Sequence, residues 1–143
     1  SLRQLPLRQA SELLLTSQKR NEPLVMVGAM KPSVHFYTNQ VIVFEGRSKN
    51  AFVNVSDRLK NEERRGWKGR PIYGSNGSET TLLVIDKRSV EKSYWQGLNP
   101  KVLGNFGVYS VWRLDREILE RRAKSLKTDG VISTWKNPRP ERF

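Results

Sequence analysis

Residues 24–30 read LVMVGAM, an unbroken run of seven apolar or small residues. The run is short and contains β-branched valines, which is typical of a strand buried on both faces of a parallel sheet. It cannot cross a bilayer, because a membrane-spanning helix needs about 20 apolar residues. Two further runs favour strands in the same way: VIVF at residues 41–44 and TTLLVI at residues 80–85. The sequence therefore predicts a sheet built around at least three strands.

Segments with helical spacing lie around these strands. Apolar residues recur every three or four positions up to residue 20, and a second such segment follows Ser48. A third segment follows Asp115 and ends near Gly130. Ser48 and Asp115 belong to the residue types that cap helix N-termini. Asp86 is placed to cap a short helix that runs to about residue 95.

The last strands are predicted to form a hairpin. Residues 101–103 and 106–114 have strand character, and Gly104 and Asn105 between them favour a turn. Residues 64–79 hold four glycines and a proline and are predicted to form a loop. Strands that alternate with helices indicate an α/β fold. We expect a mainly parallel sheet flanked by helices, with an antiparallel strand pair near the C-terminal end.

The length of 143 residues suits a single domain. We expect residues 1–135 to form one soluble α/β domain and residues 136–143 to be a loosely held basic tail. The chain begins SLRQLP, without a signal-peptide pattern, so we expect it to be a piece of a longer protein. It has no cysteine, which excludes disulfides and thiolate metal sites.

The net charge of +12 indicates an anionic partner. The excess is greatest in residues 101–143, which carry ten basic and five acidic residues. Helical spacing predicts that several basic residues of the last helix lie opposite Ile118, Leu119 and Leu126 and face solvent. The candidate contacts for anionic lipid headgroups are Arg116, Arg121, Arg122, Lys124 and Lys127.

The residues offer little for catalysis. His35 is the single histidine, and no Gly-x-Ser-x-Gly elbow presents a serine to it. Asp86 follows a strand, where α/β enzymes often place functional acids, but capping of the following helix is the favoured explanation. We therefore predict no catalytic residue, no metal ligand set and no cofactor, and leave a small enzyme that uses Asp86 or His35 as the least favoured interpretation.

A nucleic-acid-binding module is the alternative for a chain this basic. Trp67 lies among four basic residues, and Tyr94 and Trp95 follow Lys92. Aromatic and basic residues interleaved in this way can stack bases and hold phosphates. Half-buried aromatic rings under long basic side chains give the same pattern. Nucleic acid is thus a less favoured partner, within the broader alternative of an independent basic module that binds a polyanion.

Residues 22–44 resemble one known family. A strand that ends near Gly28 leads into a turn of the form Pro-Ser-x-x-Phe-Tyr-Thr and then into a second strand. The residues of this motif are Pro32, Ser33, His35, Phe36, Tyr37 and Thr38. The segment is similar to the C-terminal domain of bacterial, especially cyanobacterial, integral-membrane glycosyltransferases related to protein O-mannosyltransferases and to the lipid A aminoarabinose transferase.

The resemblance implies a function for the parent protein. Such enzymes transfer a sugar from a polyprenyl-phosphate donor to a lipid, glycan or protein acceptor. Their catalytic acids lie in loops between membrane helices, so the resemblance carries no catalytic residue onto this chain. It implies an accessory domain on the extracytoplasmic, periplasmic side, whose partners are its own membrane-spanning domain and anionic lipid headgroups or the lipid-phosphate sugar. The motif at residues 32–38 would anchor a turn or form a lip of the active site.

Overall fold

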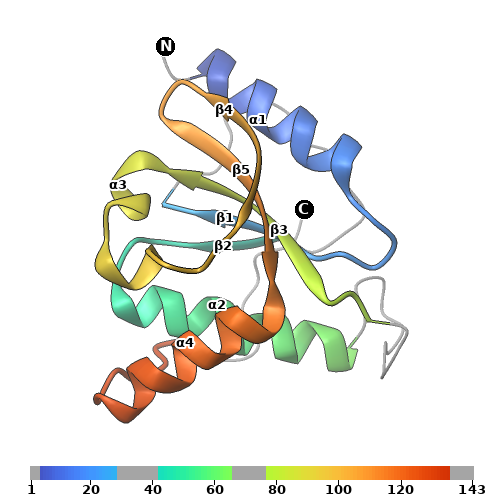
Figure 1. The fold of residues 1–143 in the computed structure, drawn as a ribbon. Helices are drawn as coiled ribbons and strands as arrows, with labels where there is room; N and C mark the ends of the chain where they lie inside the picture. Colours follow the sequence, from blue (N-terminus) through green and yellow to red (C-terminus); the bar gives the residue numbers. More distant parts are fainter. Residues whose placement is uncertain (1–3, 29–41, 66–76, 136–143) are drawn as a thin grey trace.

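The computed structural model describes residues 4–28, 42–65 and 77–135, which form one sheet with helices on both faces (Figure 1). Four helices and a short 3₁₀ segment are present in these ranges: α1 (Gln4–Ser17), α2 (Lys49–Arg65), α3 (Lys87–Val90), η2 (Ser93–Trp95) and α4 (Arg116–Thr128). The strands are β1 (Leu24–Val27), β2 (Ile42–Glu45), β3 (Thr80–Asp86), β4 (Lys101–Phe106) and β5 (Tyr109–Asp115).

The sheet has the strand order β2-β1-β3-β5-β4. Strands β2, β1 and β3 are parallel, whereas β5 runs antiparallel to both β3 and β4. The α/β prediction, with a parallel core and an antiparallel pair near the C-terminal end, is confirmed. All four residues of β1 are fully buried, as expected for a strand covered on both faces.

The predicted position of the hairpin turn is wrong. The turn between β4 and β5 lies at Gly107 and Val108, not at Gly104 and Asn105. Gly107 has φ +58°, a left-handed conformation that glycine adopts without steric cost. Gly104 lies inside β4 instead, where a Cβ atom would stand 2.8 Å from Cδ2 of Leu13 on α1. A close approach of a helix thus explains a glycine that sequence alone assigns to a turn.

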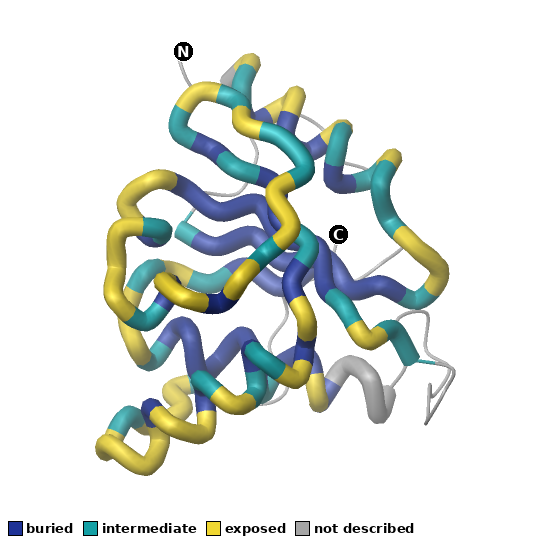
Figure 2. Tube along the Cα trace, in the orientation of Figure 1, coloured by how far each residue is buried: buried dark blue, intermediate teal, exposed yellow. Residues whose placement is uncertain are grey.

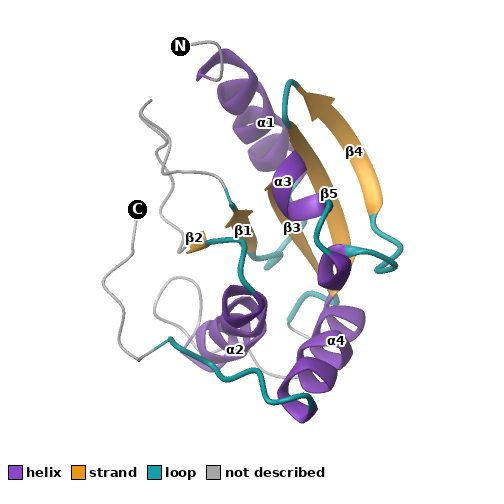
Figure 3. Cartoon of the chain, turned by 90° about the vertical axis from the view of Figure 1, so that its left-hand side faces the viewer, coloured by secondary structure: helices purple, strands orange, loops and turns teal. Residues whose placement is uncertain are grey.

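The helices cover the two faces of the sheet with separate cores. On one face α1 buries Leu7, Ala10 and Leu14 against the sheet, and on the other α2 and α4 pack together (Figure 3). Phe52 of α2 packs on Trp95, with ring centroids 4.5 Å apart. Figure 2 shows β1, β2 and β3 as mostly buried, whereas the edge strand β4 and the outer sides of the helices are exposed or half-buried.

Three helix starts follow the sequence prediction. The Ser48 hydroxyl accepts a hydrogen bond from the backbone N–H of Ala51 at the start of α2. The Asp115 carboxylate accepts from the backbone N–H groups of Glu117 and Ile118. Asp86 caps α3 in the same way. Each side chain satisfies backbone donors that have no partner within the first turn.

Residues 131–135 are held against α2 by Asn54. Its buried side-chain oxygen accepts hydrogen bonds from the Ser133 hydroxyl and from the backbone N–H groups of Thr134 and Trp135. Its amide nitrogen donates to the Thr134 hydroxyl. Asn54 also begins an Asn-Val-Ser glycosylation sequon, and this network leaves its side chain inaccessible in the folded domain. The predicted basic tail, residues 136–143, lies outside the described residues.

Candidate anion-binding pocket

The carboxyl ends of the three parallel strands meet at one edge of the sheet. Gly28 follows β1, Arg47 lies two residues beyond β2, and Asp86 ends β3. The chain passes from β1 to β2 on one side and then returns past β1 to β3, so the winding direction reverses at β1. In open α/β sheets, ligands bind outside the carboxyl ends of the strands at such a reversal. This edge is the first place to look for a site.

Arg47 joins the three strand ends. Its Nε donates to Oδ2 of Asp86 at 2.9 Å, and its Nη2 donates to the same carboxylate oxygen and to the Gly28 carbonyl at 3.0 Å. The other oxygen of Asp86 accepts from the backbone N–H of Ser89 at 3.0 Å. The guanidinium is thereby fixed in place while remaining partly exposed to solvent.

Gly28 is required by this arrangement. It has φ +72°, and a Cβ atom at this position would lie 2.4 Å from both Oδ1 of Asp86 and Oγ of Ser89. A side chain would therefore collide with the group that caps α3 and holds Arg47. The close packing of β1 against the start of α3 depends on the absence of that side chain.

Asp86 is held as a carboxylate. Burial alone raises its pKa, but the hydrogen bonds from Arg47 and Ser89 outweigh burial, and the net shift of the pKa is downward. The same hydrogen bond raises the pKa of Arg47. An acid in this state is a capping and pairing group and is poorly suited to act as a general base near neutral pH.

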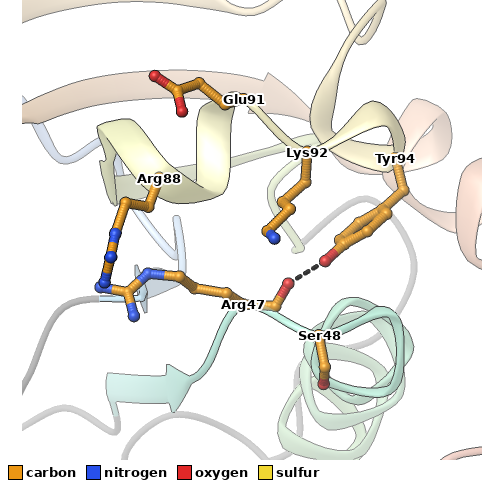
Figure 4. A pocket seen from close by; sticks show the side chains of 6 residues that line it. All are labelled: Arg47, Ser48, Arg88, Glu91, Lys92 and Tyr94. Atoms are coloured by element: carbon orange, nitrogen blue, oxygen red, sulfur yellow. Dashed lines mark hydrogen bonds between the residues drawn. The ribbon is translucent and has the colours of Figure 1, made fainter.

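Beside this ion pair lies a pocket of about 570 Å³. Its walls come from the segment that leads into α2, from α3 and from the turn that follows α3 (Figure 4). The lining residues are Arg47, Ser48, Arg88, Glu91, Lys92 and Tyr94. In Figure 4 the Arg88 side chain extends toward the end of Arg47, and Lys92 points into the space in front of Tyr94, whereas the Glu91 carboxylate points away.

The turn that carries Tyr94 is fastened on both sides. The Tyr94 hydroxyl donates a hydrogen bond to the backbone carbonyl of Arg47. From α4, Nη1 of Arg122 donates to the carbonyls of Tyr94 at 2.7 Å and of Gln96 at 2.9 Å. The ring of Tyr94 packs edge-on against Phe52. The far wall of the pocket is therefore preorganised by contacts to two helices.

Two cations in the pocket have no partner among the residues that the structure describes. Arg88 and Lys92 are exposed, and within the described part of the chain their side chains form no hydrogen bond and no ion pair. Together with Arg47 they bring three positive charges to one concave surface, where Asp86 pairs with Arg47 and the Glu91 carboxylate in the lining points away from the cations. Concave surfaces lined by one sign of charge concentrate the opposite ion. The arrangement suits a small anion.

Residues 17–130 match the family described as the C-terminal domain of cyanobacterial RgtA-type glycosyltransferases. The chain belongs to this family. Comparisons with curated proteins and with solved structures gave no match. The matched segment includes every strand and the whole pocket of this glycosyltransferase C-terminal domain. It also confirms the resemblance that residues 22–44 indicated.

The family motif lies outside the described residues of the glycosyltransferase domain. This applies to the predicted structural or lip residues Pro32, Ser33, His35, Phe36, Tyr37 and Thr38, and likewise to Trp67. Their roles stay predictions.

The basic set on α4 is only partly a solvent-facing surface. Arg121, Lys124 and Lys127 are exposed as predicted. For Arg116 the predicted exposure to solvent is wrong. Its side chain is buried and donates to the Ser78 carbonyl, because the first turn of α4 packs against the segment that leads into β3. Arg122 is half-buried in its contact with the pocket turn.

Tyr94 and Trp95 do not form a platform for bases. Trp95 is 1% exposed and packs between Phe52 and Trp112 in the core. Tyr94 is fixed by its hydroxyl and by Phe52. The pattern that favoured nucleic acid around Lys92 therefore reflects core packing under basic side chains.

Sequence reasoning missed the pocket cations Arg47, Arg88 and Lys92. The available signal was the position of Asp86 at the end of a strand, because strand ends of a parallel sheet converge.

The structure shows no candidate metal site in the residues it describes: in ranges 4–28, 42–65 and 77–135, no three His, Asp or Glu side chains come together. No helix in these ranges has the length and apolar character needed to span a membrane.

Proposed function

We propose that this chain is an accessory extracytoplasmic domain of a membrane glycosyltransferase that uses a polyprenyl-phosphate sugar donor. Family membership over residues 17–130 is the observation that carries the proposal. The transfer itself would take place in the membrane-spanning part of the parent protein. The domain would cover or shape that site from outside the bilayer.

The charge distribution supports a location beside anionic lipid. Arg121, Lys124 and Lys127 form an exposed basic row on α4. Basic residues next to an anionic membrane surface contribute about 1 kcal/mol each, and salt screens this attraction. Arg121 is paired with Glu117 and Lys127 with Asp57, at 2.6 Å and 2.8 Å, so Lys124 offers the least compensated charge.

The proposal is tested with the chain and with its full-length parent. The chain alone, incubated with polyprenyl-phosphate sugars and followed by mass spectrometry, should release and transfer no sugar. In membranes that contain the parent protein, deletion of this domain should reduce transfer while the parent remains inserted. Turnover by the chain alone, or full transfer without it, would contradict an accessory role. The DNA upstream of the codon for Ser1 should encode hydrophobic spans in the same reading frame.

A further inference from the structure

We propose that the pocket binds the phosphate of a phosphorylated ligand, with Arg88 and Lys92 as direct contacts and Arg47 as a fixed third cation. That the ligand is the phosphate of a lipid-linked sugar rests on the proposed function. That a phosphate binds here rests on the pocket alone.

The first argument is the state of the cations. Arg47 is anchored by Asp86 and by the Gly28 carbonyl, so its position is set before any ligand arrives. Its Nη1 forms no hydrogen bond within the described residues and remains available. Arg88 and Lys92 extend from α3 and the following turn into the same space (Figure 4). Arg88 and Lys92 have no counterion among the described residues, so they repel each other and Arg47, and a bound anion would relieve that repulsion.

The second argument is the chemistry of the donors. Guanidinium groups bind phosphate through paired N–H donors, and an ammonium group adds a point charge. The Ser48 segment places the N-terminus of α2 at the same wall, where the helix dipole adds positive potential. A phosphate dianion matches two or three converging cations better than a single carboxylate does.

The third argument is size. A pocket of about 570 Å³ is much larger than one phosphate group and lies in the range of small-molecule sites. The Tyr94 ring supplies an apolar wall next to the cations. The pocket thus has room for a phosphate together with the group esterified to it, which favours a phosphate ester over the free ion.

The experiment compares two charge-matched double variants of the chain. The pocket variant is Arg88→Gln with Lys92→Gln, and the control on α4 is Arg121→Gln with Lys124→Gln. Each removes two positive charges from exposed positions. Binding of inorganic phosphate, pyrophosphate and farnesyl phosphate in neutral detergent is measured by calorimetry and by amide shifts in ¹⁵N-labelled protein. Vesicles of phosphatidylglycerol in phosphatidylcholine provide the headgroup arm.

We expect the pocket variant to bind pyrophosphate and farnesyl phosphate about tenfold or more weakly, since it loses two charged hydrogen-bond donors to the phosphate. The control should bind them as the parent chain does. Amides of Ser48 and of residues 88–94 should shift on binding, and stronger binding of farnesyl phosphate than of inorganic phosphate would identify an ester ligand.

Two results overturn the phosphate site. One is equal loss in both double variants, which would mean general attraction to a basic protein. The other is the absence of amide shifts around the pocket at millimolar pyrophosphate. The vesicle arm separates this proposal from the function proposed above: the α4 control should lose vesicle binding while it keeps farnesyl phosphate. Transfer by the parent protein that is unaffected by the pocket variant would contradict the donor as ligand, yet would leave measured phosphate binding intact.

Discussion

Each end of the parallel strands has an ion pair between a carboxylate and a guanidinium, and the two pairs differ in their exposure to solvent. At the amino end of β1, Glu22 is paired with Arg113 of β5, with side chains 0% and 12% exposed. At the carboxyl end, Asp86 is paired with Arg47, with side chains 7% and 36% exposed. The first pair is almost completely enclosed by protein. The second adjoins a pocket and two cations that have no partner among the described residues.

The hydrogen bonds explain why the first pair is purely structural. The Glu22 carboxylate accepts from Nε and Nη2 of Arg113 at 2.9 Å and 3.0 Å, from the Thr80 hydroxyl and from the backbone N–H of Lys19. Arg113 also donates to the Ser17 carbonyl. Burial raises the pKa of Glu22, and these hydrogen bonds reverse the shift, so the net change is downward. The comparison indicates that an ion pair held by several further hydrogen bonds fixes one end of the sheet. An ion pair with hydrogen-bond donors left over can still bind a ligand.

Acidification tests both ends together and should have the largest effect. The pKa values of Glu22 and Asp86 are both lowered in the folded chain, so their stabilisation is present above the unfolded values, about 4.3 and 3.9. That stabilisation is lost as the pH falls through the folded pKa values. Urea unfolding from neutral pH down to about pH 2 should show a steep loss of unfolding free energy below about pH 4. A flat profile in this range would show that neither pair stabilises the fold.

Replacement of the closed pair's acid comes next. Glu22→Gln keeps the shape but leaves the largely enclosed Arg113 guanidinium without its counterion, and we expect a loss of about 3–5 kcal/mol in unfolding free energy. The measurement is a denaturant titration at neutral pH, with the acid profile repeated on the variant. The part of the acid sensitivity due to Glu22 should disappear. A smaller loss of unfolding free energy than that caused by Asp86→Asn would show that the Asp86 pair, not the Glu22 pair, contributes more to stability.

The matched change at the open end should cost less. Asp86→Asn makes the same carboxylate-to-amide replacement, but asparagine still caps a helix and Arg47 still reaches water. We expect a loss of about 1–2 kcal/mol, since exposure screens the pair. Because Arg47 is released from its position, phosphate binding at the pocket should weaken in parallel. Unchanged phosphate affinity in this variant would show that the position of Arg47 is not important for the site.

The smallest effect on stability is expected from the pocket cations. Arg88→Gln with Lys92→Gln should change the unfolding free energy by no more than about 0.5 kcal/mol, because exposed side chains without partners contribute little to folding. A thermal or urea melt measures this directly. A clear gain in stability would sharpen the comparison further, since relief of repulsion among the three cations would be its cause.

Local chemistry made most of the fold predictable from sequence. The continuous apolar run that contains β1 indicated a strand covered on both faces, and Ser48, Asp86 and Asp115 marked the starts of helices that the structure contains. The turn between β4 and β5 was misplaced because two glycines were close enough for either to form it. The choice depends on Leu13, which lies about 90 residues away in the chain and requires the space at Gly104. Such a tertiary contact leaves no local sequence signal.

The candidate pocket was much less predictable. Arg47 is separated from Arg88 and Lys92 by 41 or more residues in the sequence. These cations meet because the parallel pairing of β2, β1 and β3 places the carboxyl ends of the strands at one edge of the sheet. Density of basic residues pointed instead to α4. On that helix, Arg116 and Arg122 donate hydrogen bonds to the carbonyls of Ser78 and Tyr94. A count of basic residues does not distinguish such structural side chains from side chains that could bind an anion.

The contact between Arg58 and β2 also bears on whether a second chain can pair with the edge of the sheet. Among the described strands β2 lies at one edge of the sheet, with the Glu45 carbonyl bonded to the Gly28 N–H on its inner side. Carbonyls alternate along a strand, so that of Phe44 points outward, where an open edge would template a foreign strand. The buried Arg58 donates to it at 2.9 Å and to Glu45 at 2.7 Å. A side chain from α2 thereby occupies an acceptor that amyloid-like stacking would need.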